Sequence, residues 1–336
     1  MTSYTGIQGQ NILIVSSDPA NPTEGQIWYN STSNLLKGYA NVVTNAWASG
    51  GNYPQGVDGL GTAGTQTATV GFAGGNSVIF VTAANLYDGT SWTATGSMGN
   101  TFPNGRAYVG AVGTQTAALG IAGYSQPPGA AANTAVVESF NGTTWSPSPA
   151  INTARRIMGC AGISTAALIF GGYGPNFSTA TESYNGSSWT TLPATLPTGV
   201  AGLSGAGTQT AALSFGGDLG PAYTNTTASY NGSAWTTVNS LNTARGYGGG
   251  FGIQTAALYA GGGTTTPQLN GTELWNGTSW TTNPTGMSNS RIYTFGNGTQ
   301  TSGLITAGQA GPPGVKITAT EEWTGTQLAT RTITVS

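Results

Sequence analysis

A nine-residue phrase that returns along the chain constrains its fold more than any other feature. The stretch "ESYNGSSWT" at 182–190 recurs almost unchanged as "ASYNGSAWT" at 228–236 and "ELWNGTSWT" at 273–281. Aligned on its tryptophan, the phrase gives seven slots, at spacings of 45, 53, 44, 46, 45 and 48 residues. The last slot holds Leu328, and the other six hold Trp47, Trp92, Trp145, Trp189, Trp235 and Trp280. A period of this length fits four short strands, which is one blade of a β-propeller.

Each repeat divides into recognisable strands. A glycine-rich stretch such as "RGYGGGFG" at 245–252 predicts the innermost strand, since only small residues fit near a propeller axis. "TQTAAL" or a variant follows it, and an aromatic residue five positions before the tryptophan marks the third strand. Asn-Gly or Asp-Gly lies between that aromatic residue and the tryptophan. This pair favours a tight hairpin in which both central residues have φ > 0.

The N-terminal region decides the number of blades. "LLKGYANVVTNAWASGG" at 35–51 matches the hairpin with a weak turn, and 26–30 is a candidate strand before it. We therefore predict an all-β propeller of seven four-stranded blades over 26–336, preceded by an N-terminal docking arm at 1–25. Six blades with an N-terminal appendage are the alternative. The C-terminal stretch 330–336 is expected to close against the N-terminal blade.

Charged residues are rare, with 8 Lys and Arg and 10 Asp and Glu among 336 residues, where about a quarter is usual. The net charge of −2 leaves no basic stripe to displace counterions, so nucleic acid is not an expected partner. The apolar stretch 11–17 is too short to span a bilayer, and no membrane insertion is expected. With no histidine and a single cysteine, Cys160, in a small buried slot, we expect no disulfide, no metal and no cofactor.

Two columns of the alignment hold much of the scarce charge. One carries arginine in four repeats but Val57 or Val200 in the others, and the second carries glutamate in the same four repeats but Asn85 or Ala228 in the others. Because the two residue types occur together, we predict one ion pair inside each of four blades. The predicted pairs are Arg106–Glu138, Arg155–Glu182, Arg245–Glu273 and Arg291–Glu321. A ring of arginines that binds an anion at the axis is the alternative.

The tryptophan column is predicted to pack between blades rather than to bind sugar. Aromatic residues outside the repeat register, Trp28 and Tyr124 among them, are freer for contact with a ligand. Three long insertions, at 123–135, 216–226 and 308–316, interrupt the link between the second and third strands. Such loops gather on one face of a propeller and are the expected place for binding.

The order of diglycine, aromatic residue, tryptophan and arginine resembles the Kelch repeat, whose fold is a β-propeller of four-stranded blades. Runs such as "TATESYNGSSWTTL", "LNTARGYGG" and "GTQTAALSFGG" are similar to Kelch-like virion proteins of tailed bacteriophages, especially those of cyanobacteria and marine bacteria. The opening stretch at 18–39 also resembles N-terminal segments of phage virion proteins. The resemblance implies a structural or host-contacting virion protein: a tail fibre, a tail-associated component or a capsid decoration.

Three functions follow as expectations. The first is a non-enzymatic virion protein, assembled in the host cytoplasm and present in multiple copies per particle, which docks on other virion proteins through its N-terminal segment. The second is a lectin-like module whose insertions bind a host surface glycan. The third is an enzyme, which we do not favour, because galactose-oxidase chemistry requires histidine ligands that the sequence lacks. The carboxylates left outside the predicted ion pairs also form no close sequence pair.

Overall fold

The computed structural model describes residues 12–42, 44–99, 105–125, 132–264, 267–311 and 314–333. These residues form strands and turns and contain no helix, so none of them belongs to a helix that would cross a bilayer. The chain divides into two compact units. The smaller is made of Met1–Asn45 and Gly325–Ser336, and the larger of Ala46–Thr324.

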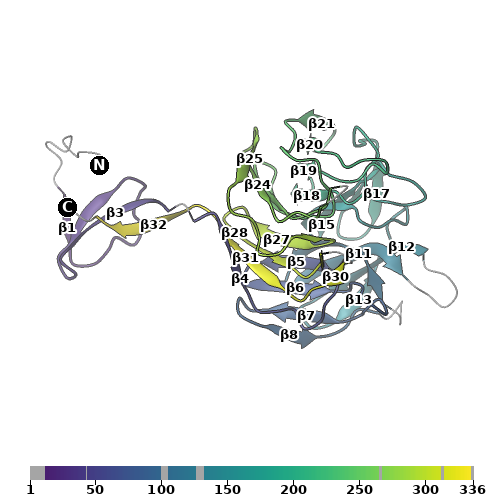
Figure 1. The fold of residues 1–336 in the computed structure, drawn as a ribbon, viewed down its shortest axis with the longest axis horizontal. Helices are drawn as coiled ribbons and strands as arrows, with labels where there is room; N and C mark the ends of the chain where they lie inside the picture. Colours follow the sequence, from purple (N-terminus) through teal and green to yellow (C-terminus); the bar gives the residue numbers. More distant parts are fainter. Residues whose placement is uncertain are drawn as a thin grey trace. The chain divides into compact units, whose positions relative to one another are not determined.

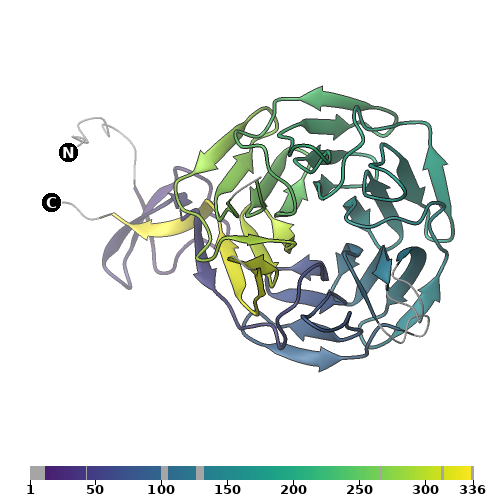
Figure 2. The same cartoon turned by 45° about the vertical axis from the view of Figure 1, so that its right-hand side comes forward.

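The larger unit is a ring of six four-stranded antiparallel sheets, which Figure 2 shows arranged radially around a common axis. We number these sheets as blades 1 to 6. Blade 1 contains β5 (Gly61–Thr65), β6 (Ala68–Phe72), β7 (Ala84–Tyr87) and β8 (Trp92–Thr95). Blade 2 contains β10 (Gly110–Thr114), β11 (Ala117–Ser125), β12 (Ala132–Phe140) and β13 (Trp145–Ser148). Blade 3 contains β14 (Gly159–Ile163), β15 (Ala166–Phe170), β16 (Thr181–Tyr184) and β17 (Trp189–Leu192).

The remaining blades repeat this order, and Figure 1 labels most of their strands. Blade 4 contains β18 (Ser204–Gly207), β19 (Ala212–Phe215), β20 (Thr227–Tyr230) and β21 (Trp235–Val238). Blade 5 contains β22 (Gly249–Ile253), β23 (Ala256–Ala260), β24 (Thr272–Trp275) and β25 (Trp280–Asn283). Blade 6 contains β27 (Phe295–Thr299), β28 (Ser302–Thr306), β31 (Thr320–Thr324) and β4 (Ala46–Ser49). One further short strand, β9 (Arg106–Ala107), pairs with β11 in blade 2. Three others form a small sheet of their own: β26 (Arg291–Ile292), β29 (Gln309–Ala310) and β30 (Val315–Lys316).

The ring closes by pairing the two ends of the larger unit. The innermost strands β5, β10, β14, β18, β22 and β27 lie side by side in that order, and β27 lies beside β5. Blade 6 takes three strands from the C-terminal part and its outermost strand, β4, from the N-terminal part. Trp47 in β4 lies opposite Trp323 in β31, and it therefore fills the slot that the alignment gave to Leu328. The backbone of Leu328 instead pairs with Asn41 in the smaller unit.

The described residues thus form six blades, which matches the alternative prediction and not the favoured one of seven. The strands expected to make a seventh blade, β2 (Ile27–Asn30) and β3 (Leu35–Val42), pair with each other and with β1 (Leu13–Val15) and β32 (Gln327–Thr332). The domain boundary therefore lies after residue 45 and not after residue 25. Residues 1–11 of the predicted docking arm lie outside the described residues.

The smaller unit has its own polar centre. Asp18 accepts hydrogen bonds from Trp28 Nε1 at 3.0 Å, Asn30 Nδ2 at 2.7 Å and Lys37 Nζ at 2.7 Å. These bonds hold the pKa of the Asp18 carboxyl at about 2, with Lys37 the largest cause. Trp28 is fully buried, so the prediction that it is available for contact with a ligand is wrong.

The hairpin between the third and fourth strands also differs from the predicted turn. Phe140 pairs with Trp145, which leaves a loop of four residues, 141–144. Only Gly142 in this loop has a positive φ, of 97°. The side-chain oxygen of Asn141 accepts hydrogen bonds from the backbone N–H groups of Thr143 and Thr144. Asn-Gly is therefore used here because asparagine closes the turn with its side chain and glycine adopts the left-handed conformation.

Candidate functional site

The structure brings together each predicted Arg–Glu pair, and every pair lies inside one blade. In blade 3, Arg155 Nη2 is 2.5 Å from Glu182 Oε1, while Glu182 Oε2 accepts the backbone N–H of Asn152 at 2.7 Å. The equivalent pairs are Arg106–Glu138 at 2.8 Å, Arg245–Glu273 at 3.0 Å and Arg291–Glu321. All eight side chains are at most 3% exposed. This burial argues against the alternative in which the arginines bind an anion at the axis.

The two blades without an ion pair fill the same place with neutral groups. In blade 1, the hydroxyl of Tyr53 donates to the carbonyl of Gly71 at 3.2 Å and accepts a hydrogen bond from Asn85 at 3.1 Å. In blade 4, Val200 and Ala228 are both buried and help to line a hollow of about 40 Å³. A buried tyrosine and a pair of apolar residues thus replace the two charges.

The tryptophan column packs between blades, as the sequence predicted. The ring of Trp235 lies 4.8 Å from that of Phe170 in the preceding blade, and its Nε1 donates to Thr181 Oγ1 of that blade at 3.0 Å. Equivalent hydrogen bonds join Trp47 to Thr272, Trp92 to Thr320 and Trp280 to Thr227.

Two of the six tryptophans lack this hydrogen bond. The Nε1 groups of Trp145 and Trp189 are buried and have no partner among the described residues. The threonine position of the preceding blade holds Ala84 in one case and Val137 in the other. A hydroxyl is therefore missing at these two of the six blade interfaces.

A second contact between blades was missed in the sequence. The amide of Gln115, in the "TQTAAL" box, donates to the carbonyls of Thr69 and Tyr87 in the preceding blade at 3.2 and 2.7 Å. The other glutamines of the box also donate to carbonyls of the preceding blade, and these are Gln66, Gln209, Gln254 and Gln300. Blade 3 has Ser164 at this position. The signal was visible as a glutamine that recurs at one position of the "TQTAAL" box in five of the six copies.

One end of the axis is surrounded by six residues, one from each blade, which we name the axial collar. Its members are Gly59, Tyr108, Ile157, Gly202, Tyr247 and Tyr293. All six have φ between 49° and 63°, and backbone hydrogen bonds link each blade to the next, for example from Tyr108 N to Gly59 O at 2.6 Å. Left-handed conformations of bulky residues cost about 1–3 kcal/mol each and gather at functional sites. The collar is therefore the first place to look for binding.

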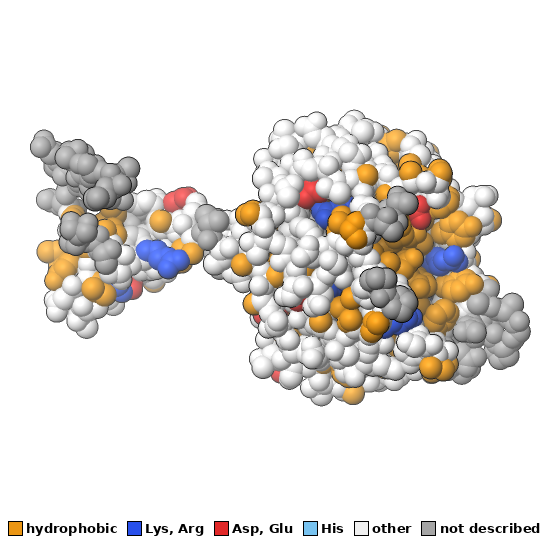
Figure 3. All heavy atoms as spheres, in the orientation of Figure 1, with side chains coloured by type: hydrophobic (Ala, Val, Ile, Leu, Met, Phe, Trp, Pro, Cys, Tyr) orange, Lys and Arg blue, Asp and Glu red, His pale blue; other side chains and the backbone are white. Residues whose placement is uncertain are grey.

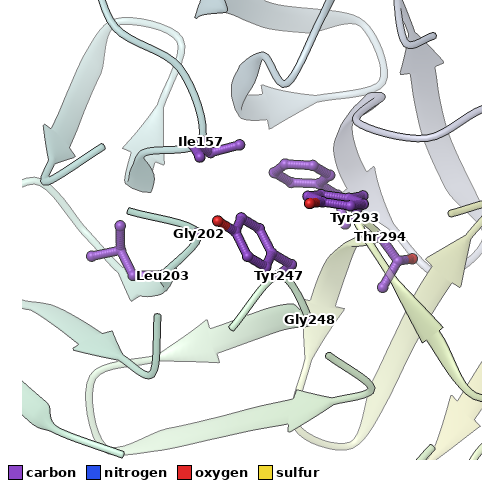
Figure 4. A pocket seen from close by; sticks show the side chains of 8 residues that line it. Ile157, Gly202, Leu203, Tyr247, Gly248, Tyr293 and Thr294 are labelled. Atoms are coloured by element: carbon purple, nitrogen blue, oxygen red, sulfur yellow. The ribbon is translucent and has the colours of Figure 1, made fainter. Parts of the chain in front are cut away.

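The tyrosine rings of the collar pack on its glycines and on one another. A Cβ atom at Gly59 would lie 2.5 Å from the ring of Tyr108, and one at Gly202 would lie 2.4 Å from the ring of Tyr247. The ring of Tyr293 lies 5.5 Å from that of Tyr108 and 4.6 Å from that of Tyr247. Figure 4 shows Tyr247 and Tyr293 beside a small hollow that Ile157 also lines.

More aromatic residues surround the collar on the same face. Tyr124 lies near the end of the second strand of blade 2, and Tyr173 and Tyr223 come from segments that follow the second strands of blades 3 and 4. The backbones of Tyr124 and Tyr173 pair with residues that directly precede the collar, and that of Tyr223 pairs with Asp218. We name these three residues and Tyr108, Tyr247 and Tyr293 the tyrosine face. All six side chains are half-buried. Figure 3 shows hydrophobic side chains gathered over the ends of β11 and β12, with Lys or Arg side chains beside them.

The carboxylates of this face are already engaged. Asp218 accepts a hydrogen bond from the Tyr247 hydroxyl at 2.6 Å, and Asp58 pairs with Lys316 at 2.9 Å. Asp58 belongs to blade 1 and Asp218 to blade 4, on opposite sides of the six-bladed ring. No group of three or more metal-ligating side chains forms among the described residues.

Burial reinforces the protonated state of the collar tyrosines. It raises the pKa of the Tyr108, Tyr247 and Tyr293 hydroxyls above its ordinary value, and for Tyr247 the hydrogen bond to Asp218 adds to the effect. These three tyrosines therefore remain protonated and act as hydrogen-bond donors rather than nucleophiles. Within the ring, Cys160 lines a central hollow, and burial raises the pKa of its thiol to about 12.

The sequence located part of this face. The three predicted insertions supply Tyr124, Asp218, Tyr223 and Lys316, and the sequence predicts Tyr124 to be free for contact with a ligand. The collar tyrosines were missed, although each stands two positions after the arginine column. The collar position holds glycine, tyrosine or isoleucine in different repeats, and only the structure shows that these residues meet at one axis.

Comparison with known proteins gives the fold. No protein-family model matches the sequence, and no curated protein matches it. The solved structure of YjhT is similar, with a TM-score of 0.68 at 15% identity, and the match covers 83% of this chain and 99% of that one. The chain is a β-propeller. At this identity the likeness concerns the fold alone, so function has to be argued from the site.

Proposed function

We propose that this chain is a non-enzymatic virion protein of a tailed bacteriophage, in which the propeller contacts the host surface through the tyrosine face. The observation that carries the proposal is the concentration of six half-buried tyrosines around one end of the axis. Tyrosine supplies a large rigid surface and a hydrogen-bonding hydroxyl at little cost in conformational entropy. A sugar ring offers matching apolar faces and hydroxyl groups.

The protonation of the site favours binding over catalysis. The hydroxyls of Tyr108, Tyr247 and Tyr293 stay protonated, and the carboxylates Asp58 and Asp218 are each held by a neighbouring side chain. General acid–base catalysis requires a carboxyl poised near the reacting group, and glycoside hydrolysis requires two that face each other within about 10 Å. Asp58 and Asp218 belong to opposite blades and are occupied.

The virion assignment rests on the resemblance of the repeats to Kelch-like phage proteins. The two-unit organisation agrees with it, because a small sheet that holds both ends of the described chain is a natural attachment unit. We propose that this unit docks on other virion proteins and that the particle carries several copies. A tail fibre or tail-associated component is the preferred location, and a capsid decoration is the alternative.

Binding of the purified chain to host cells and to a glycan array tests the proposal. We expect Tyr124→Ala and Tyr223→Ala to weaken binding about tenfold or more, since loss of an aromatic contact costs about 1–3 kcal/mol. Ile163→Ala and Ile253→Ala are matched controls, because these exposed apolar residues lie at the far end of the inner strands from the collar. Equal losses in both sets, or no binding by the wild type, would refute a role for the tyrosine face.

The particle assignment needs a separate measurement. Mass spectrometry of purified virions should detect the chain, and antibodies raised against the propeller should label the tail. Labelling of the head would replace the tail assignment with capsid decoration. Absence of the chain from virions would refute the virion proposal and leave the binding result unaffected.

A further inference from the structure

Arg156 differs from the four arginines that form the buried pairs. It follows Arg155 directly, but Arg155 is fully buried whereas Arg156 is half-buried on the tyrosine face. Arg156 makes no ion pair with any residue that the structure describes. The chain has only 18 charged residues. A cation that lies on an aromatic face and has no carboxylate partner there is therefore a candidate to bind an anionic ligand.

The Arg156 guanidinium is held in place by three neighbours. Its central carbon lies 4.4 Å from the ring centre of Tyr124 and 4.8 Å from that of Tyr173. Nη1 donates to Asn133 Oδ1 at 2.7 Å, and the amide nitrogen of Asn133 is fixed in turn by the carbonyl of Gly174 at 3.0 Å. These contacts use the faces of the guanidinium and one nitrogen, and they leave its other N–H groups for a further acceptor.

The collar places an aromatic surface beside this cation. Ile157, the next residue after Arg156, donates its backbone N–H to the carbonyl of Tyr108 at 3.1 Å. The hydroxyls of Tyr108 and Tyr293 make no hydrogen bond to a described residue and remain protonated. A fixed planar cation therefore adjoins apolar rings and two hydroxyl donors.

We propose that Arg156 binds the carboxylate of an acidic saccharide whose sugar rings lie on the tyrosine face. A guanidinium matches the two oxygens of a carboxylate, and a fork that is already held in place loses little entropy on binding. Nucleic acid fits less well, because a polyanion requires several cations along a groove. The proposal rests on the tyrosine face being the binding surface and adds the charge of the ligand.

Calorimetry with a galacturonic acid trimer tests the proposal, and its methyl-esterified form is the neutral counterpart. We expect the wild type to bind the acid at least about tenfold more tightly than the ester, since charge-assisted hydrogen bonds are roughly twice as strong as neutral ones. Arg156→Gln should remove this preference while keeping the affinity for the ester. Arg331→Gln, which changes an exposed arginine of the smaller unit, should leave both affinities unchanged.

Further outcomes and ligands in this experiment separate the inference from the proposed function. Equal wild-type affinity for acid and ester, or an undiminished preference in Arg156→Gln, would overturn the role of Arg156 while leaving sugar binding in place. Tighter binding of a 6-sulfated galactose trimer than of the acid would overturn the choice of carboxylate. Binding of single-stranded DNA that depends on Arg156 would overturn the saccharide. The melting temperature of Arg156→Gln should match that of the wild type, so that lost preference reports on the ligand and not on folding.

Discussion

Blades 3 and 4 solve the same packing problem in different ways. Blade 3 links the start of its inner strand to its third strand with Arg155 and Glu182, while blade 4 uses Val200 and Ala228 and leaves a small hollow. Both blades keep the same four strands and the same register between third and fourth strands. The ion pair is therefore not required to form a blade. Where the pair is present, however, each charged side chain requires the other, since a buried charge left alone is strongly destabilising.

Breaking one pair gives the largest expected effect. Arg155→Ala should lower the free energy of unfolding by about 3–5 kcal/mol, because Glu182 would remain buried without its cation. Val200→Ala, at the equivalent position of blade 4, should cost only about 1–2 kcal/mol as a lost apolar contact. Chemical denaturation of the two variants measures the difference. Equal losses would show that the pair behaves like ordinary packing.

Replacing the ion pair of blade 3 with the apolar residues of blade 4 sharpens the comparison. The double variant Arg155→Val, Glu182→Ala should lose only about 1–2 kcal/mol, since it removes both charges and leaves a hollow similar to that of blade 4, about 40 Å³. Each single substitution should cost more than the double variant. Strict additivity of the two single effects would contradict the coupling between these side chains.

The interfaces between blades offer a smaller contrast. Gln209 of blade 4 donates to the carbonyls of Ala167 and Tyr184 in blade 3, at 3.1 and 2.5 Å, but blade 3 has Ser164 in the equivalent place. Gln209→Ala should lower stability by about 1–2 kcal/mol, because two carbonyls lose a donor. Ser164→Ala should change it by less than about 0.5 kcal/mol. Thermal unfolding of both variants measures these changes. A larger loss of stability for Ser164→Ala than for Gln209→Ala would show that the glutamine does not stabilise the blade interface.

Features that recur from blade to blade were predictable from the sequence. The pairing of Arg155 with Glu182 followed from columns that gain and lose charge together, and the position of Trp235 followed from its fixed spacing. Repetition supplies several observations of one local structure, so even a single sequence carries a form of internal comparison.

Features that depend on closing the ring were not predictable in the same way. Trp47 opens the alignment but completes the last blade, because β4 pairs with β31 across the two ends of the larger unit. Spacing alone gives the order of strands and not the sheet that an outer strand joins. The collar was missed for the same reason, since Tyr108 and Tyr293 are far apart in the sequence and meet only around the axis.

The smallest expected effect concerns the tryptophans without a hydrogen bond. Thr181 of blade 3 accepts a hydrogen bond from the indole N–H of Trp235 in blade 4 at 3.0 Å, and Val137 holds the equivalent position in blade 2. Val137→Thr should therefore supply a hydroxyl that accepts the unpaired indole N–H of Trp189 in blade 3. The gained hydrogen bond, about 1 kcal/mol, offsets the lost apolar methyl group, so stability should stay level or rise by up to about 1 kcal/mol. Val70→Thr, at another fully buried valine, should instead cost about 1–2 kcal/mol. Slower hydrogen exchange at the Trp189 indole would report the new bond directly, whereas equal losses in the two variants would show that the threonine column does not stabilise the blade interfaces.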